Sequence, residues 1–128
     1  MSSTVNLSLK VSVASGPSIS ISKAVTVEAY DKIDVTVAAG DSDKVVEIQP
    51  GASSQVQILL IKASEYGTDL TYKVHDAAAT PIVLDQDQFY LGQGQVGLLG
   101  AQIDKLLFTN NLAKNVTIEI LVGRDATP

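Results

Sequence analysis

The chain has 128 residues, with fourteen acidic and nine basic side chains, a formal net charge of -5 and no cysteine. This length fits one domain with a core of its own, and the missing cysteine excludes disulfides and thiolate metal sites. The basic residues are scattered, so the charge pattern excludes the electrostatic footprint expected for nucleic acid or an anionic membrane.

Targeting and membrane segments are not expected either. The N-terminal residues 1–6 have neither the basic nor the apolar part of a signal peptide. The longest apolar run, residues 58–61, is far too short to span a bilayer.

The first stretch of the chain alternates apolar and polar residues, which is typical of β-strands with one dry and one wet face. We predict strands over residues 4–13, 18–22 and 24–30, with a break at 15–17. Lys23 falls on the apolar parity, so a strand end, a bulge or a sheet edge is expected there.

The next elements follow from turn residues. Tyr30, Asp31 and Lys32 indicate a turn into a strand over 33–38. Residues 39–43, rich in Gly and Asp, indicate a hairpin loop into a strand over 44–49, which ends at Pro50.

The alternation gives way to a solid apolar run within the strand predicted over 55–63. This run consists of Ile58, Leu59, Leu60 and Ile61. A strand that is apolar on both faces must be covered on both, by a second sheet or by another subunit.

Strands are also predicted over 70–75, 82–84, 103–109 and 115–122, with a helical turn or a strand over 85–92. The glycines of residues 92–100 indicate a flexible or inter-subunit loop, and residues 1–4 and 123–128 indicate exposed terminal arms. About eight strands joined by short loops predict a single all-β domain over 1–128, an antiparallel β-sandwich or jelly roll.

Reactive constellations are scarce. His75, the only histidine, lies on a polar parity beside Asp76 and has no nucleophile assigned to it, so we expect a solvated strand-end residue and no enzyme activity. The acidic pairs at 41–43 and 85–87 are favoured as turn residues, with weak calcium binding left open. The glycines of 92–97 lack the following helix of a dinucleotide site, so no cofactor or metal is expected.

The composition favours association with further copies of the same chain. The chain is 45% hydrophobic and only 5% aromatic, so its core is aliphatic, and the apolar excess favours a symmetric oligomer over a sandwich that is simply well filled. We expect subunit contacts where the alternation is interrupted by a lysine, where it is replaced by a continuous apolar run, and where glycines free the backbone, together with the basic residue of the tail. These residues are Lys23, Ile58, Leu59, Leu60, Ile61, Gly92, Gly94, Gly97, Leu98, Leu99 and Arg124.

Two stretches resemble small all-β proteins of tailed bacteriophage virions. They are residues 56–67 followed by 70–74, and the closing stretch 116–125. The proteins in question are the cement or decoration proteins that sit on capsid lattices as jelly-roll or β-tulip trimers. The resemblance implies a non-catalytic trimer that clamps capsid subunits in a virion assembled in the host cytoplasm, and it carries no functional residue with it.

The main alternative is a binding module, such as a carbohydrate-binding sandwich. Such modules commonly expose aromatic platforms. The rings available for one are Tyr30, Tyr66, Tyr72, Tyr90, Phe89 and Phe108.

Overall fold

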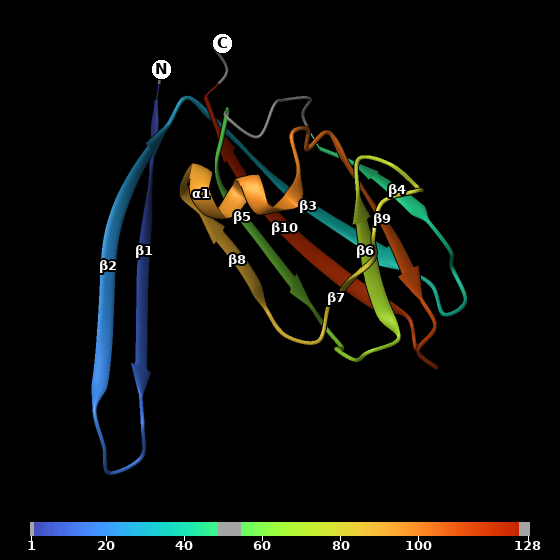
Figure 1. The fold of residues 1–128 in the computed structure, drawn as a ribbon, viewed down its shortest axis with the longest axis horizontal. Coiled ribbons are helices and arrows are strands. Elements are labelled where there is room, and N and C mark those ends of the chain that lie inside the picture. The colour runs from blue at the N-terminus through green and yellow to red at the C-terminus, as the bar shows by residue number, and fades with distance from the viewer. Residues whose placement is uncertain (1, 49–54, 126–128) are drawn as a thin grey trace.

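The computed structural model describes residues 2–48 and 55–125, which form two packed sheets and a projecting two-stranded arm (Figure 1). The first sheet has the strand order β3 (Ala29–Val37), β10 (Val116–Arg124), β5 (Val56–Ala63) and β8 (Gln88–Leu91). The second has the order β4 (Lys44–Glu47), β9 (Lys105–Asn110), β6 (Leu70–Val74) and β7 (Ile82–Val83). Every described pairing is antiparallel, so the predicted all-β antiparallel sandwich is confirmed.

Successive strands of the sandwich mostly change sheets. Among the described strands of the sandwich, only β6 and β7 are consecutive in the chain and paired side by side. The loop at 39–43 therefore carries the chain from β3 in the first sheet to β4 in the second, and the expected hairpin there is wrong. Asp41 shapes this crossing, because its carboxylate accepts a hydrogen bond from the Ala38 amide at 2.9 Å.

The core lies between the sheets and is built from the alternate side chains of each strand that point inward. Ile118 and Ile120 of β10 are fully buried there, as are Leu106 and Phe108 of β9. Tyr72 of β6 packs its ring at 5.7 Å from that of Phe108. The rest of the buried core is aliphatic, as the composition predicts.

The apolar run of β5 divides between two environments. Leu59 and Ile61 are fully buried between the sheets. Ile58 and Leu60 have the opposite parity and point to the outer face of the first sheet. Ile58 is only 2% exposed, because it lies against Gly123 beside Val27, the last residue of the arm. The two faces are thus covered by the second sheet and, over Ile58, by the chain's own arm.

The arm is a hairpin of β1 (Ser3–Ser12) and β2 (Ser18–Val27), which form a two-stranded sheet of their own. The strands predicted over 18–22 and 24–30 are one continuous strand up to Val27. Lys23 pairs with Leu7 in unbroken register, so the expected strand end or bulge is wrong, whereas the expected sheet edge is confirmed.

The turn before the third strand lies at Glu28 and not at residues 30–32, where the sequence predicted it. Those residues belong to β3, and the chain bends at Glu28, between β2 and β3. The Glu28 amide donates to the Arg124 carbonyl at 3.1 Å, which ties the base of the arm to the end of β10.

The glycine-rich stretch is helical where a loose loop was expected. It forms the short helix α1 (Gly92–Val96) and a 3-10 turn over Gly97–Leu99, and Val96 is fully buried in the core. The residues before it form β8 over part of 85–92, in agreement with the strand alternative.

Part of each predicted terminal arm belongs to a strand. Ser3 and Thr4 already belong to β1, and Gly123 and Arg124 belong to β10. The Asp125 amide donates to the Gln55 carbonyl at 2.8 Å. Residues 1 and 126–128, and the predicted end of the fourth strand at Pro50, lie outside the described residues.

Packing at Gly123 gives the first testable expectation. A Cβ atom at Gly123 would lie 2.5 Å from Ile58 Cγ2 and 3.0 Å from Val27 Cγ1, so Gly123→Ala must push the base of the arm away from the sheet. We expect the free energy of unfolding to fall by about 1–3 kcal/mol, measured by urea denaturation.

Gly94→Ala is the matched control. Nothing lies within 4 Å of a Cβ atom at Gly94, in helix α1. Stability should stay the same or rise by up to about 1 kcal/mol, because alanine loses less backbone entropy than glycine. Equal stability of the Gly123→Ala variant and the parent chain would contradict the packing argument.

Candidate interaction surface

The arm has one apolar and one polar face. Because β1 and β2 pair in register, odd-numbered residues of both strands share a face, as in the pairs Val5–Val25, Leu9–Ile21 and Val11–Ile19. The even-numbered face carries serine, threonine and asparagine together with Lys10 and Ala24. The arm is therefore an amphipathic ribbon.

Much of the apolar face is uncovered, increasingly toward the tip. Leu9 and Ile21 are 43% and 38% exposed, whereas Val11, Val13 and Ile19 reach 55–66%. A two-stranded hairpin alone is at best marginally stable in water. The arm thus combines weak intrinsic stability with a row of side chains that gain from burial.

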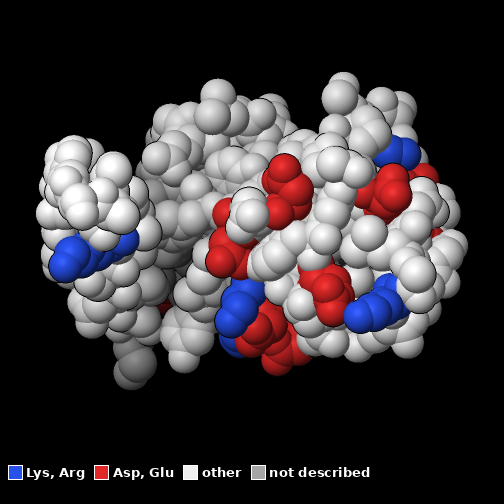
Figure 2. Space-filling view, turned by 90° about the horizontal axis from the view of Figure 1, so that it is seen from below, with Lys and Arg blue, Asp and Glu red and all other residues white. Residues whose placement is uncertain are grey.

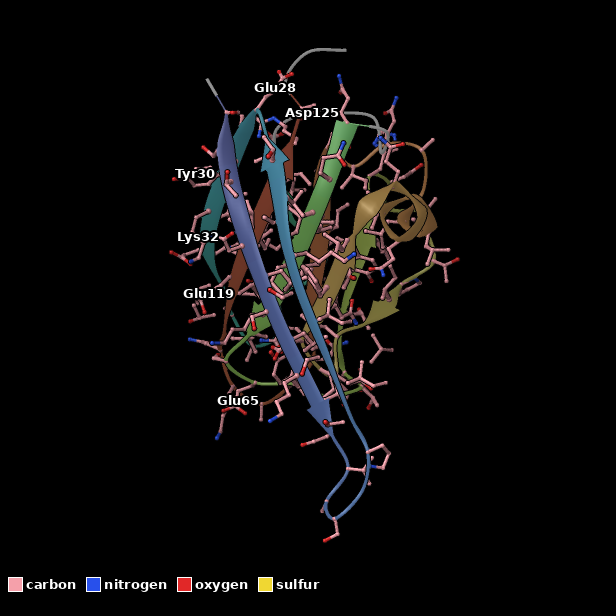
Figure 3. The ribbon with its side chains drawn as sticks, turned by 90° about the vertical axis from the view of Figure 1, so that its left-hand side faces the viewer. Glu28, Tyr30, Lys32, Glu65, Glu119 and Asp125 are labelled. Atoms are coloured by element: carbon pink, nitrogen blue, oxygen red, sulfur yellow. The ribbon has the colours of Figure 1, made fainter. Side chains whose placement is uncertain are left out.

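A groove of about 590 Å³ separates the arm from the outer face of the first sheet. Figure 3 shows the arm crossing in front of that sheet as a further layer. The apolar side chains that line the groove are Leu7, Leu9 and Ile21 from the arm, and Leu60, Phe89 and Leu91 from β5 and β8. Both walls are apolar because Leu60 pairs with Phe89, and Ile58 with Leu91, on the outer parity of the sheet.

Polar contacts fix the sheet side of the groove. Gln95 and Asp87 are its polar lining residues. The Gln95 side chain accepts a hydrogen bond from the Leu91 amide at 2.8 Å, which joins α1 to the end of β8. The Tyr66 hydroxyl donates to the Asp87 carboxylate. Burial, the larger cause, and this hydrogen bond both raise the pKa of Tyr66.

Charge is divided unequally between the arm and the sandwich. Lys10 and Lys23 are the only charged side chains of residues 1–27, so this segment carries +2. The remaining seven basic and all fourteen acidic residues lie in 28–128, which carries -7. In Figure 2 the arm forms a separate lobe whose visible charge is basic, while acidic side chains gather on the sandwich.

Beside the arm, the β3 and β10 side of the first sheet carries a charged cluster. Lys32 lies 2.5 Å from Asp34 and 3.2 Å from Glu119, and Lys62 lies 3.9 Å from Glu119 (Figure 3). The hydrogen bond to Asp34, followed by that to Glu119, raises the pKa of Lys32. The apolar wall of the groove is thus bounded by ion pairs on one side.

The structure separates the residues that sequence placed at subunit contacts. Leu60 lines the groove and Lys23 lies on the apolar face of the arm. Leu59 and Ile61 belong to the core. The arm and β8 supply the other groove residues. The alternation showed that the arm is amphipathic, but it did not show that the arm faces Phe89 and Leu91 of β8.

The glycine-rich residues lie on α1 and the 3-10 turn. These are Gly92, Gly94, Gly97, Leu98 and Leu99. Leu98 is 80% exposed and, with Leu99 and Ile82, lines a separate hollow of about 220 Å³ beside β6 and β7. Leu98 and Leu99 therefore do not share a surface with the groove.

Arg124 has a partner within its own chain. Its guanidinium donates to the Asp31 carboxylate at 2.6 Å, and its side chain is only 15% exposed. This pair joins β10 to β3 beside the base of the arm, so Arg124 links two neighbouring strands of the first sheet.

The predicted reactive residues sit in ordinary structural contacts. His75 Nδ1 donates to the Asp104 carboxylate at 2.6 Å, and Asp76 accepts from the Ala78 amide at 3.0 Å. Asp43 pairs with Lys73 at 3.1 Å. Among the described residues, no cluster of three or more His, Asp or Glu side chains has the arrangement to hold a metal ion.

The aromatic rings do not gather into one platform. Tyr72 and Phe108 are fully buried. The Tyr72 hydroxyl lies 3.0 Å from that of Tyr90 and also donates to Gln88; burial, the largest cause, raises the pKa of Tyr72. Tyr30, 55% exposed, lies on β3 at the far edge of the first sheet from Phe89 of β8.

Comparison with models of known families, with curated proteins and with solved structures finds no match. None of the helices in the described part of the chain has the length and apolar character needed to cross a bilayer.

The His75–Asp104 pair gives an expectation for pH. The hydrogen bond from His75 lowers the pKa of Asp104, so the folded state favours the carboxylate. This stabilisation is present above the ordinary carboxyl range and is lost as pH falls through the lowered pKa. We expect Asp104→Asn to reduce stability by less than about 1 kcal/mol at pH 6, because the pair is accessible to solvent.

Urea denaturation of both proteins from pH 6 to pH 2 tests this. The difference between the parent chain and Asp104→Asn should shrink toward zero at the acidic end. Asp85→Asn, which removes an exposed carboxylate outside the pair, serves as the control for the loss of one negative charge. A difference that stays constant down to pH 2 would argue against the pair as its source.

Proposed function

We propose that the protein is a non-catalytic structural component of a virion, a cement or decoration protein that clamps neighbouring capsid subunits as a symmetric oligomer, with a trimer as the expected form. The observation that carries this proposal is the projecting amphipathic arm. Its apolar face, exposed on Val11, Val13 and Ile19, is suited to association. Clamping works through buried apolar area and backbone pairing, and it needs no reactive group.

The topology gives further support. The eight described strands of the sandwich are divided between two four-stranded sheets, and the first sheet holds the first, eighth, third and sixth of them. We infer a jelly roll, the double-sheet arrangement of two Greek keys that occurs in viral capsid and lectin domains. A fold shared by both classes does not choose between them, so the arm carries the choice.

The carbohydrate-binding alternative finds less support in the geometry. A sugar platform needs exposed rings that face one ligand, and the exposed ring of Tyr30 and the partly exposed ring of Phe89 lie on opposite edges of the first sheet. The groove next to Phe89 is lined mainly by aliphatic side chains, which offer few hydrogen bonds to hydroxyl groups.

Purified virions of the virus that encodes the chain provide the direct test. Quantitative mass spectrometry should find the protein in a fixed ratio to the major capsid protein, and it should remain after a density-gradient wash. Virions that contain none of it would overturn the proposal.

A variant pair tests the part played by the arm. Ile21→Asp places a charge on the apolar face of the arm, whereas Ser20→Asp places the same charge on the polar face one residue away. Binding of the purified protein to capsid shells stripped of it should fall roughly tenfold or more for Ile21→Asp, because a monomer loses the avidity of an oligomer.

Ser20→Asp should bind as the parent chain does in the same co-sedimentation assay. Equal losses for the two variants would show that the apolar face of the arm is not what matters.

A further inference from the structure

We propose that the arm packs, apolar face down, on the outer face of the first sheet of a second copy of this chain, so that copies are joined by exchanged arms. This inference deepens the proposed function and rests on it for its setting, because it names the partner of the arm. The surface that receives the arm is the apolar wall of the groove, formed by Leu60, Phe89 and Leu91.

The two walls of the groove are matched in chemistry. Leu7, Leu9 and Ile21 face Leu60, Phe89 and Leu91 across a space that remains open. A surface that complements an element of its own chain complements the same element of another copy, which is the basis of exchange between protomers. Glu28 alone separates β2 from β3, so a change of backbone angles at this bend would redirect the whole arm.

The length of the arm argues for a second copy as the partner. Val11, Val13 and Ile19 do not line the groove, and they are the most exposed large apolar side chains of the arm. Figures 1 and 3 both show the turn of the arm extending beyond the end of the sandwich. Closure of the arm on its own sheet leaves this end uncovered within a single chain, whereas an arm that joins two copies lies between two sandwiches, either of which can cover this end.

The polar face of the arm excludes insertion between the two walls. A segment that filled the groove of a neighbour from within would need two apolar faces, and the arm has one, since Ser8, Lys10 and Ser20 lie on the other. The arm of a second copy must therefore replace the resident arm on the sheet. The resident arm is then free to do the same on its neighbour.

Charge favours the same pairing. The segment that holds the arm carries +2 and the remainder of the chain carries -7, so an arm is attracted to a foreign sandwich and repelled by a foreign arm. The groove itself contains Asp87. Lys23, on the apolar face, would be costly between two arms packed face to face, because each would present the same lysine.

The area is adequate when arms are exchanged reciprocally. A ten-residue ribbon is about 33 Å long and roughly 10 Å wide, so one docked face removes about 700 Å² in total from the two partners. Two such contacts give about 1,400 Å², within the range of specific interfaces. In a ring of copies, such as a trimer, each interface holds only one docked arm. The buried area then reaches the range of specific interfaces when neighbouring sandwiches also touch.

The absence of cysteine makes cross-linking a clean test. Ile21→Cys and Phe89→Cys are made on separate chains, the second with a size tag, and the two are mixed and treated with a short bis-maleimide. We expect a covalent heterodimer at least fivefold more abundant than from Ser20→Cys mixed with Phe89→Cys. Leu9→Cys, opposite Ile21 in the hairpin, replaces Ile21→Cys if that variant does not fold.

Three results would overturn the exchange. One is a monomeric mass for the unmodified chain by light scattering at micromolar concentration. Another is a double variant, Ile21→Cys with Phe89→Cys, that cross-links only within one chain. The third is a dominant arm-to-arm product between two Ile21→Cys chains.

Failure of the exchange and failure of the proposed function are distinguishable. Heterodimers together with virions that lack the protein would leave the exchange standing and remove the virion role. A monomer that is nevertheless abundant in virions would do the reverse.

Discussion

The close packing of Ile58 and Val27 on Gly123 is the contact on which the arrangement of the molecule depends. Gly123 has no side chain, so β10 leaves room for a valine from the arm and an isoleucine from β5 on the outer face of the first sheet. The Glu28–Arg124 backbone bond and the Arg124–Asp31 ion pair lie next to this point. The base of the arm is held by these contacts, while the arm beyond its base remains open to a partner.

The two halves of the chain solve the problem of apolar burial differently. The sandwich closes over its own core through strands that alternate between sheets, and its acidic groups are engaged in turns and ion pairs such as those of Asp41 and Asp43. The strands of the arm pair only with each other, and most of its apolar face remains to be covered. An element that folds incompletely on its own suits a protein whose stable form is an assembly.

Sequence reasoning predicted the strands well where polar and apolar residues alternate, because that pattern directly reports a half-buried strand. It did not predict that the first two strands form a separate arm, since alternation does not show what covers the apolar face of a strand. The glycines of 92–100 predicted a loose loop, and the structure has a short helix there. Glycine has a weak intrinsic helix preference, but the burial of Val96 in the core stabilises the helical turn. Arg124 looked like part of an exposed tail, and only the pairing of β10 with β3 revealed its partner Asp31.

The position of the arm ahead of the sandwich in the chain has a kinetic consequence. A local hairpin forms within microseconds, whereas the surface that receives it is built from β5 and β8, which follow far later and need long-range pairing. A nascent arm therefore waits with an apolar face and two open edges, a state prone to indiscriminate strand addition. Lys23 lies midway along the ribbon on one face and Lys10 lies nearer its turn on the other, so both faces carry a charge that acts as a gatekeeper during that interval.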